Sequence, residues 1–150
     1  MLKSVHRHAA AICLGLLYTG ATLAQAELAA SAAKEAGATV TPSGLVYRSL
    51  EEGKGPSPTA TDTVTVHYRG TLANGTEFDS SYKRHAPAQF PLSGVIPCWT
   101  EGVQRMKVGG KSQLVCPSDL AYGDQGRPSI PGGATLVFEI ELLEIVAPPK

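Results

Sequence analysis

The sequence has few of the residues on which most catalytic chemistry depends. Its 150 residues include one tryptophan, two methionines, three cysteines and four histidines. It contains no GxSxG nucleophile elbow, Walker A loop, dinucleotide fingerprint or HExxH pair. His67 and His85 have no partner at metal-ligand spacing, and Cys98 and Cys116 lack the paired spacing of a zinc site. We therefore expect no metal and no cofactor.

An excess of charge is also missing. The 13 basic residues balance the 13 acidic residues, and the formal net charge is zero. Because nucleic-acid binding requires a concentration of positive charge, we expect no nucleic-acid partner.

Only the N-terminal segment is continuously apolar. Lys3 and Arg7 precede an apolar run over residues 9–23, and the run ends in small residues at 24–26. The run is shorter than the roughly 20 apolar residues of a usual membrane span. This pattern predicts a signal peptide over residues 1–26, cleaved after Ala26, and a periplasmic or secreted protein without membrane contact. A retained N-terminal anchor is the alternative.

The rest of the chain reads as a linker followed by one domain. Residues 27–41 are rich in alanine and predict a short linker or a frayed helix, and the domain spans 42–147. Residues 63–68 alternate between Val or Tyr and polar side chains, and Asn74-Gly75 is a hairpin signal. Strands are expected over residues 45–50, 63–72, around 77–78, 111–116 and 135–145.

The last strand and one helix determine the expected fold class. Leu136, Phe138, Ile140 and Leu142 share one face of the last strand. A helix is expected over residues 100–106, with Trp99, Val103 and Met106 on its apolar face, Pro97 near its first turn and Gly109-Gly110 at its end. The predicted class is α+β: a bent antiparallel sheet of about five strands wrapped around one short helix.

Two cysteines remain after the predicted cleavage. Export would carry Cys98 and Cys116 into a compartment where thiols tend to be oxidised, so a single disulfide is one interpretation. The other is a pair of buried thiols that act as small hydrophobic side chains. The function of the large apolar side chains, some of which end in a polar group, is also open at this point. Composition alone predicts that they form an ordinary hydrophobic core.

Four segments in a fixed order resemble one family. Residues 66–81 resemble the opening hairpin of the FKBP peptidyl-prolyl cis/trans isomerases, and residues 95–103 resemble the helix of that family. Residues 120–123 and 134–143 are similar to its loop and final strand. The predicted signal peptide and the lead-in at 42–47 resemble the bacterial, exported branch of the family.

The resemblance implies a pocket with a Trp99 floor. It implies that the Ile96 N–H and the Tyr122 hydroxyl bind ligand carbonyls. Cys98 replaces a common glycine, and Cys116 lies just after the strand that should pass near it, so the resemblance favours a disulfide between Cys98 and Cys116. The implied catalytic residues are Tyr68, Phe78, Asp79, Trp99, Tyr122 and Phe138. The implied substrate-binding residues are Phe90, Val95, Ile96 and Ile130. Asp79 is either an electrostatic partner of the rotating carbonyl carbon or a hydrogen-bond partner of Tyr122, or it orients the pocket wall, which is the role that we favour.

Some residues depart from the family pattern. Ala88 stands where many members have an aromatic side chain, so the wall there is expected to be more open. Arg127 lies in a loop that varies among members, and residues 128–133 are one residue shorter than in some relatives.

The function implied is acceleration of proline-limited folding of exported proteins. The expected partners are Pro-containing polypeptide segments, with FK506- or rapamycin-type macrolides as inhibitors and no strong signal for a dimer, so we expect a monomer. A binding module or holdase that grips the same segments without catalysis is the alternative.

Overall fold

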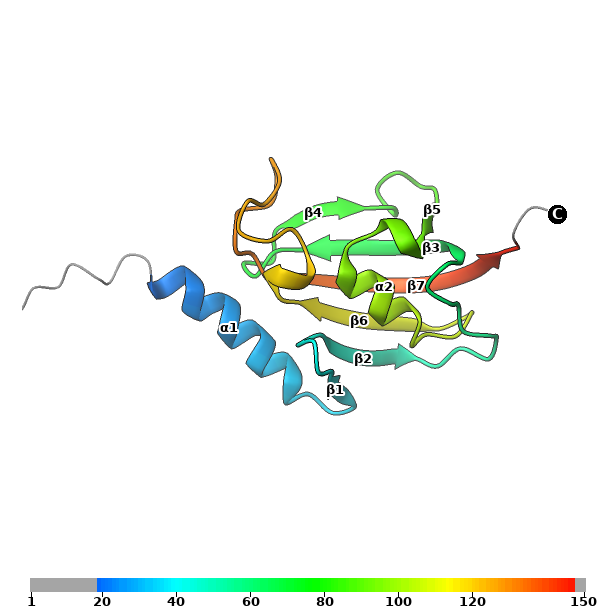
Figure 1. The fold of residues 1–150 in the computed structure, drawn as a ribbon, viewed down its shortest axis with the longest axis horizontal. Helices are drawn as coiled ribbons and strands as arrows, with labels where there is room; N and C mark the ends of the chain where they lie inside the picture. Colours follow the sequence, from blue (N-terminus) through cyan, green and yellow to red (C-terminus); the bar gives the residue numbers. More distant parts are fainter. Residues whose placement is uncertain (1–18, 148–150) are drawn as a thin grey trace, which may run out of the picture.

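Alternating buried and exposed residues along the chain build one antiparallel sheet. The computed structural model of the protein describes residues 19–147 (Figure 1). Six of its seven strands follow the order β1-β2-β6-β7-β3-β4, and the seventh, β5, pairs with β3. The strands are β1 (Ala38–Val40), β2 (Val46–Glu51), β3 (Thr63–Thr71), β4 (Glu77–Ser80), β5 (Ala88–Pro91), β6 (Lys111–Cys116) and β7 (Leu136–Val146).

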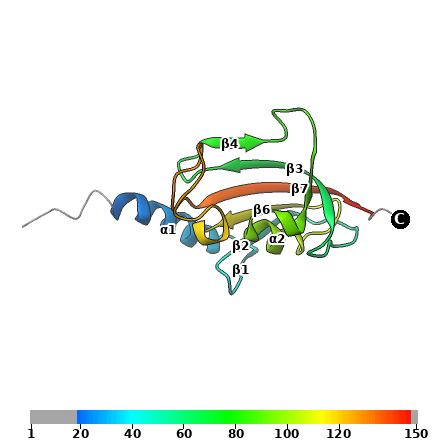
Figure 2. The ribbon, with the colours of Figure 1, turned by 45° about the horizontal axis from the view of Figure 1, so that its top comes forward.

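The β3–β4 hairpin forms where the sequence predicts it. Gly75 has a φ of 85°, which its lack of a side chain permits, and the Thr76 N–H donates to the Asn74 side chain at 2.9 Å. β4 pairs with β3 at residues 69–71, whereas β5 pairs with β3 at residues 63–66. In Figure 2, β4 and the segment that follows it stand at this edge of the sheet.

Apolar side chains pack on both faces of the sheet. Leu114, Phe138 and Ile140 belong to the main core, on the face that carries α2 (Pro97–Val103). Val46 and Val115 alternate with main-core residues along their strands and pack instead against α1 (Thr19–Ala33). Since successive residues of a strand face opposite sides, this alternation places α1 and α2 on opposite faces.

Gly102 allows α2 to lie close to the sheet. A Cβ atom at this position would overlap the side chain of Leu114 on β6. Pro97 occupies the first turn, as predicted, but the helix ends at Val103 rather than Met106. The Met106 N–H donates to the Val103 carbonyl in a turn, and the Met106 side chain is still buried. The close approach of α2 to β6 holds Trp99 over the sheet.

The predicted fold class is confirmed, with two strands more than expected. β6 has the predicted bounds, and β3 and β7 differ from the prediction by one residue at their ends. Leu136, Phe138 and Ile140 are buried on β7, as the alternation requires. The additional strands, β1 and β5, are three and four residues long, too short for a periodic pattern to indicate them.

The N-terminal predictions fall only partly on described residues. Most of the predicted signal peptide lies outside residues 19–147, and its cleavage stays a prediction. Residues 27–41 contain the end of α1, a turn and β1, and the Arg48 guanidinium pairs with Glu35 at 2.8 Å. Among the described residues, no helix has the length and hydrophobicity of a membrane span.

Candidate functional site: an aromatic cavity with a tryptophan floor

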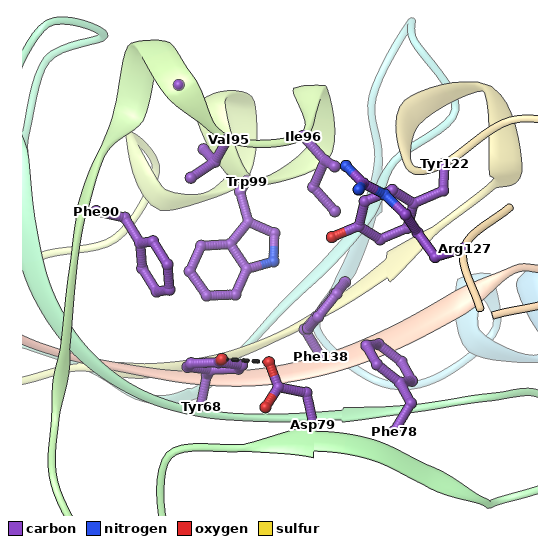
Figure 3. Close-up of a pocket in the computed structure, with 11 residues that line it drawn as sticks. Tyr68, Phe78, Asp79, Phe90, Val95, Ile96, Trp99, Tyr122, Arg127 and Phe138 are labelled. Carbon is purple, nitrogen blue, oxygen red and sulfur yellow. Dashed lines mark hydrogen bonds between the residues drawn. The ribbon is translucent and has the colours of Figure 1, made fainter. Parts of the chain in front are cut away.

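A cavity of about 260 Å³ opens between α2 and the sheet (Figure 3). Its lining comes from β3, β4, β5, α2 and β7 and from the loops before α2 and after the 3₁₀ turn η2 (Ser118–Leu120). The lining residues are Tyr68, Phe78, Asp79, Phe90, Gly94, Val95, Ile96, Trp99, Tyr122, Arg127 and Phe138. The volume is slightly below the roughly 300 Å³ at which sites for drug-sized ligands begin, so it suits one ring and its neighbouring groups.

Trp99 forms the floor and is held by three aromatic rings. Its ring centroid lies 5.2 Å from that of Tyr68, 5.4 Å from Phe90 and 5.4 Å from Phe138. The interplanar angles of 82°, 83° and 90° are edge-to-face arrangements, which the quadrupoles of aromatic rings favour. Trp99 is 4% exposed, so the indole is fixed by packing while it still borders the cavity.

The indole N–H of Trp99 is a polar group at this floor. Within the described part of the chain it is buried and has no hydrogen-bond acceptor. A buried unpaired donor costs on the order of 1–3 kcal/mol, so the floor keeps a polar edge at some expense in stability.

Gly70 on β3 makes room for two of the wall rings. A Cβ atom at this position would come within 2.5 Å of the tip of Phe78 and 2.9 Å of Phe138. These two rings pack edge-to-face with centroids 5.7 Å apart. A larger residue at this position would push both rings towards the cavity.

Tyr68, Asp79 and Arg84 form a polar wall opposite the helix. The Tyr68 hydroxyl donates to the Asp79 carboxylate, and the Arg84 guanidinium donates to Asp79 Oδ1 at 2.5 Å and to the Tyr68 hydroxyl at 2.8 Å. The Ser80 backbone N–H also donates to Asp79, at 2.9 Å. Asp79 therefore contacts Tyr68 and not Tyr122, and its carboxylate is fixed beside the aromatic wall.

This network shifts the pKa values of both acids in the wall. Burial raises the pKa of Tyr68 above its ordinary value, and the hydrogen bond to Asp79 adds to the effect. Burial also works against ionisation of Asp79, but hydrogen bonds from Tyr68 and Arg84 outweigh it and lower the pKa of the carboxyl. Asp79 is thus charged, and Tyr68 neutral, over a wide range of pH.

The pocket should be insensitive to pH between about 5 and about 9. A carboxyl whose folded pKa lies below its unfolded value of about 4 contributes stability above that value and loses it only as pH falls through the lower folded pKa. Tyr68 titrates above its ordinary value of about 10. The fluorescence of Trp99, the one tryptophan in the chain, should therefore stay constant in this range. A transition centred near pH 6 or 7 would contradict this network.

The rim carries two hydrogen-bond donors that have no partner among the described residues. The Ile96 carbonyl accepts hydrogen bonds from the backbone N–H groups of Trp99, at 3.0 Å, and Thr100, at 3.2 Å. The backbone N–H of Ile96 donates to no residue in the described part of the chain. The Tyr122 hydroxyl points into the cavity in Figure 3 and is likewise unpaired. Both donors are available to carbonyl oxygens of a bound molecule.

A disulfide connects the start of α2 to the sheet. Cys98, immediately before Trp99, is joined to Cys116 at the end of β6, with their Cα atoms 5.8 Å apart. Both residues are fully buried. The bond ties the helical turn that carries the floor residue to a central strand.

The structure gathers nine of the ten sequence-predicted pocket residues around the cavity. The exception is Ile130, which is 5% exposed and packs in the core. Its backbone pairs with Arg127, and its side chain belongs to the core rather than to the cavity lining. Sequence analysis missed Arg84 entirely. A basic residue five positions after Asp79 was the available signal, but no periodic pattern connects the two.

Comparisons with known proteins agree with this architecture. Residues 55–143 match the family described as FKBP-type peptidyl-prolyl cis-trans isomerase. The chain belongs to this family. An FKBP relative, the FKBP-type peptidyl-prolyl cis-trans isomerase FkpA of Escherichia coli K12, is 53% identical over 118 residues, which are 79% of this chain and 44% of that protein.

Two solved structures are also similar. The crystal structure of FkpA from Escherichia coli has a TM-score of 0.84 and 48% identity, covering 87% of this chain and 62% of that one. A peptidyl-prolyl cis-trans isomerase from Pseudomonas syringae pv. tomato DC3000 has a TM-score of 0.79 and 37% identity, covering 86% of this chain and 96% of that one. The match to the curated FkpA relative, by contrast, covers less than half of that protein's length.

Proposed function

We propose that this protein is a peptidyl-prolyl cis/trans isomerase that accelerates proline-limited folding of exported proteins. The observation that supports it most is the aromatic cavity with an indole floor, which Tyr68 and Tyr122 border. Membership of the FKBP family supports the same reaction. Because the chain spans 44% of the FkpA relative, activity and clients are proposed for this chain rather than transferred to it.

Such a cavity can catalyse rotation without covalent chemistry. The amide C–N bond has partial double-bond character, and its barrier to rotation is about 18–20 kcal/mol. The twisted transition state loses resonance and has a less polar carbonyl than the planar ground state. An apolar cavity therefore disfavours the planar amide relative to the twisted one, and binding differs between the two states.

The polar groups of the rim and wall hold the substrate in position. The unpaired donors of Ile96 and Tyr122 bind carbonyls on the two sides of the prolyl ring, while the ring itself lies on Trp99. Asp79 already accepts hydrogen bonds from Tyr68 and Arg84, which favours a role in orienting the wall. Because the reaction moves no proton, none of these groups acts as an acid or a base.

The proposed export is compatible with the fold. Cleavage after Ala26 would divide α1, but the helical residues known to pack against the sheet, Leu28, Ala29, Ala32 and Ala33, all lie after that position. Gln25 would be lost with its contact to the Thr135 N–H at 2.6 Å. The domain would keep the apolar contacts between α1 and the sheet. We expect a periplasmic or secreted monomer, and we expect FK506- or rapamycin-type macrolides to inhibit it by binding in the same cavity.

A binding module or holdase is the second candidate. It would use the same cavity to grip Pro-containing segments, and the rim donors of Ile96 and Tyr122 would suit it equally. The two candidates differ only in whether the bound amide rotates faster than the free one.

Exchange spectroscopy on a short X-Pro peptide separates the two functions. Uncatalysed isomerisation takes tens to hundreds of seconds. A catalytic amount of the intact protein should increase the isomerisation rate in proportion to the protein concentration. Arg105→Gln, at an exposed position outside the cavity lining, provides a matched control that should behave like the wild type. Peptide binding without any acceleration would favour the binding module and contradict the enzyme.

A further inference from the structure

Arg127 places a cation at the mouth of the cavity. Its guanidinium carbon lies 5.1 Å from the centroid of the Tyr122 ring, and Figure 3 shows the group beside Ile96 and Tyr122. The side chain also lines an open groove that continues outward from the cavity, together with Gly94, Val95, Ile96, Ala121, Tyr122, Gln125 and Gly126. Arg127 therefore lines both the cavity and the groove that adjoins it.

Local structure holds this arginine in place. The Arg127 N–H donates to the Ile130 carbonyl at 2.8 Å, and the Ile130 N–H donates back at 2.9 Å. Gly126 has a φ of 66°, and a Cβ atom there would overlap the backbone of residues 130–132, so the turn is closely defined. An arginine that stacks on an aromatic ring also loses less freedom when it binds a planar partner.

The charge of Arg127 is uncompensated, unlike that of the other arginine at the site. Arg84 is paired with Asp79 at 2.5 Å, which neutralises the one carboxylate of the cavity lining. No ion pair in the described residues includes Arg127, and the exposed Asp124 three positions earlier forms none with it. Among the residues that line the cavity and the groove, Arg127 is therefore the charged side chain that no ion pair neutralises.

We propose that Arg127 gives the site a preference for X-Pro segments with an acidic residue next to the proline. This deepens the proposed isomerase function and rests on it. A proline in the cavity leads its neighbouring residue past the guanidinium, which can bind a Glu or Asp carboxylate through two parallel hydrogen bonds. The substrate class is an acidic prolyl dipeptide within an unfolded chain.

Matched peptides with Glu, Gln or Lys on either side of the proline test this preference. For an exposed pair of charges, we expect kcat/KM for the better Glu peptide to exceed that of its Gln counterpart by about two- to fivefold at low salt. The ratio should fall to about one in Arg127→Gln and below one in Arg127→Glu, and it should stay at the wild-type value in Arg105→Gln. At about 1 M salt, where the screening length is roughly 3 Å, the wild-type preference should shrink.

Two results would overturn the proposal. One is a Glu-to-Gln ratio of one in the wild type at both positions. The other is an undiminished ratio in Arg127→Gln. Binding of the same peptides, followed by Trp99 fluorescence, gives the same ratio independently of catalysis. If the protein isomerises no peptide, the proposed function fails, and the ratio of binding constants still decides whether Arg127 selects acidic segments.

Discussion

Replacement of Trp99 by leucine should lower kcat/KM for an X-Pro peptide by at least about tenfold. A tenfold loss corresponds to about 1.4 kcal/mol of transition-state stabilisation. Leucine cannot present a flat surface to the prolyl ring, and it loses three edge-to-face contacts, with Tyr68, Phe90 and Phe138, each worth about 0.5–1.5 kcal/mol. The substitution therefore removes the flat floor together with its contacts to the three supporting rings. A steady-state assay over peptide concentrations below and above KM measures kcat/KM for both proteins.

A second variant separates lost stability from lost catalysis. Val103 is fully buried on the same helix but does not line the cavity. Val103→Ala removes apolar groups worth about 0.8 kcal/mol per CH₂, so it should destabilise the fold by roughly 2 kcal/mol while kcat/KM stays close to that of the wild type. If the two variants lose activity equally, the indole has only a structural role.

Loss of the disulfide should lower the free energy of unfolding by about 3 kcal/mol. The bond closes a loop between residues separated by 18 positions, and the chain-entropy relation gives this magnitude for loops of that size. Urea denaturation of a Cys98→Ala, Cys116→Ala double variant, compared with the oxidised wild type, measures the loss. The bond joins the helix carrying Trp99 to β6, so the first turn of α2 should become less protected from hydrogen exchange.

Reduction of the wild type provides the control for this measurement. A reducing agent should bring the wild type down to the stability of the double variant and should leave the double variant unchanged. Equal stability of the oxidised wild type and the double variant would show that the cross-link contributes nothing.

Strands with strict alternation were the most predictable part of the fold. In β3 and β7 each buried residue is followed by a more exposed one, so the buried face of each strand follows from the residues themselves. β5 could not be found in this way, because it is four residues long and ends in Pro91, which is typical of an edge. β1 is shorter still and exists through its pairing with β2.

The candidate site was predictable where the family resemblance covers its residues and less so elsewhere. Family resemblance indicated the aromatic wall, but the partner of Asp79 was not apparent, because Arg84 reaches both Asp79 and Tyr68 from a turn without periodicity. Ile130 is buried in a loop whose path no local pattern describes. In each case a contact between segments, rather than a local preference, determines where the side chain lies.

Rotation of the X-Pro bond should occur inside the indole-floored cavity, and filling that cavity during catalysis tests this expectation. Isomerisation of one X-Pro peptide should be followed by exchange spectroscopy with a catalytic amount of the intact protein, first alone and then with an FK506-type macrolide. We expect acceleration that disappears as the macrolide fills the cavity and quenches or shifts the Trp99 emission. If acceleration persists while the Trp99 emission reports a filled cavity, the X-Pro amide rotates at another site, and rotation inside the cavity is contradicted.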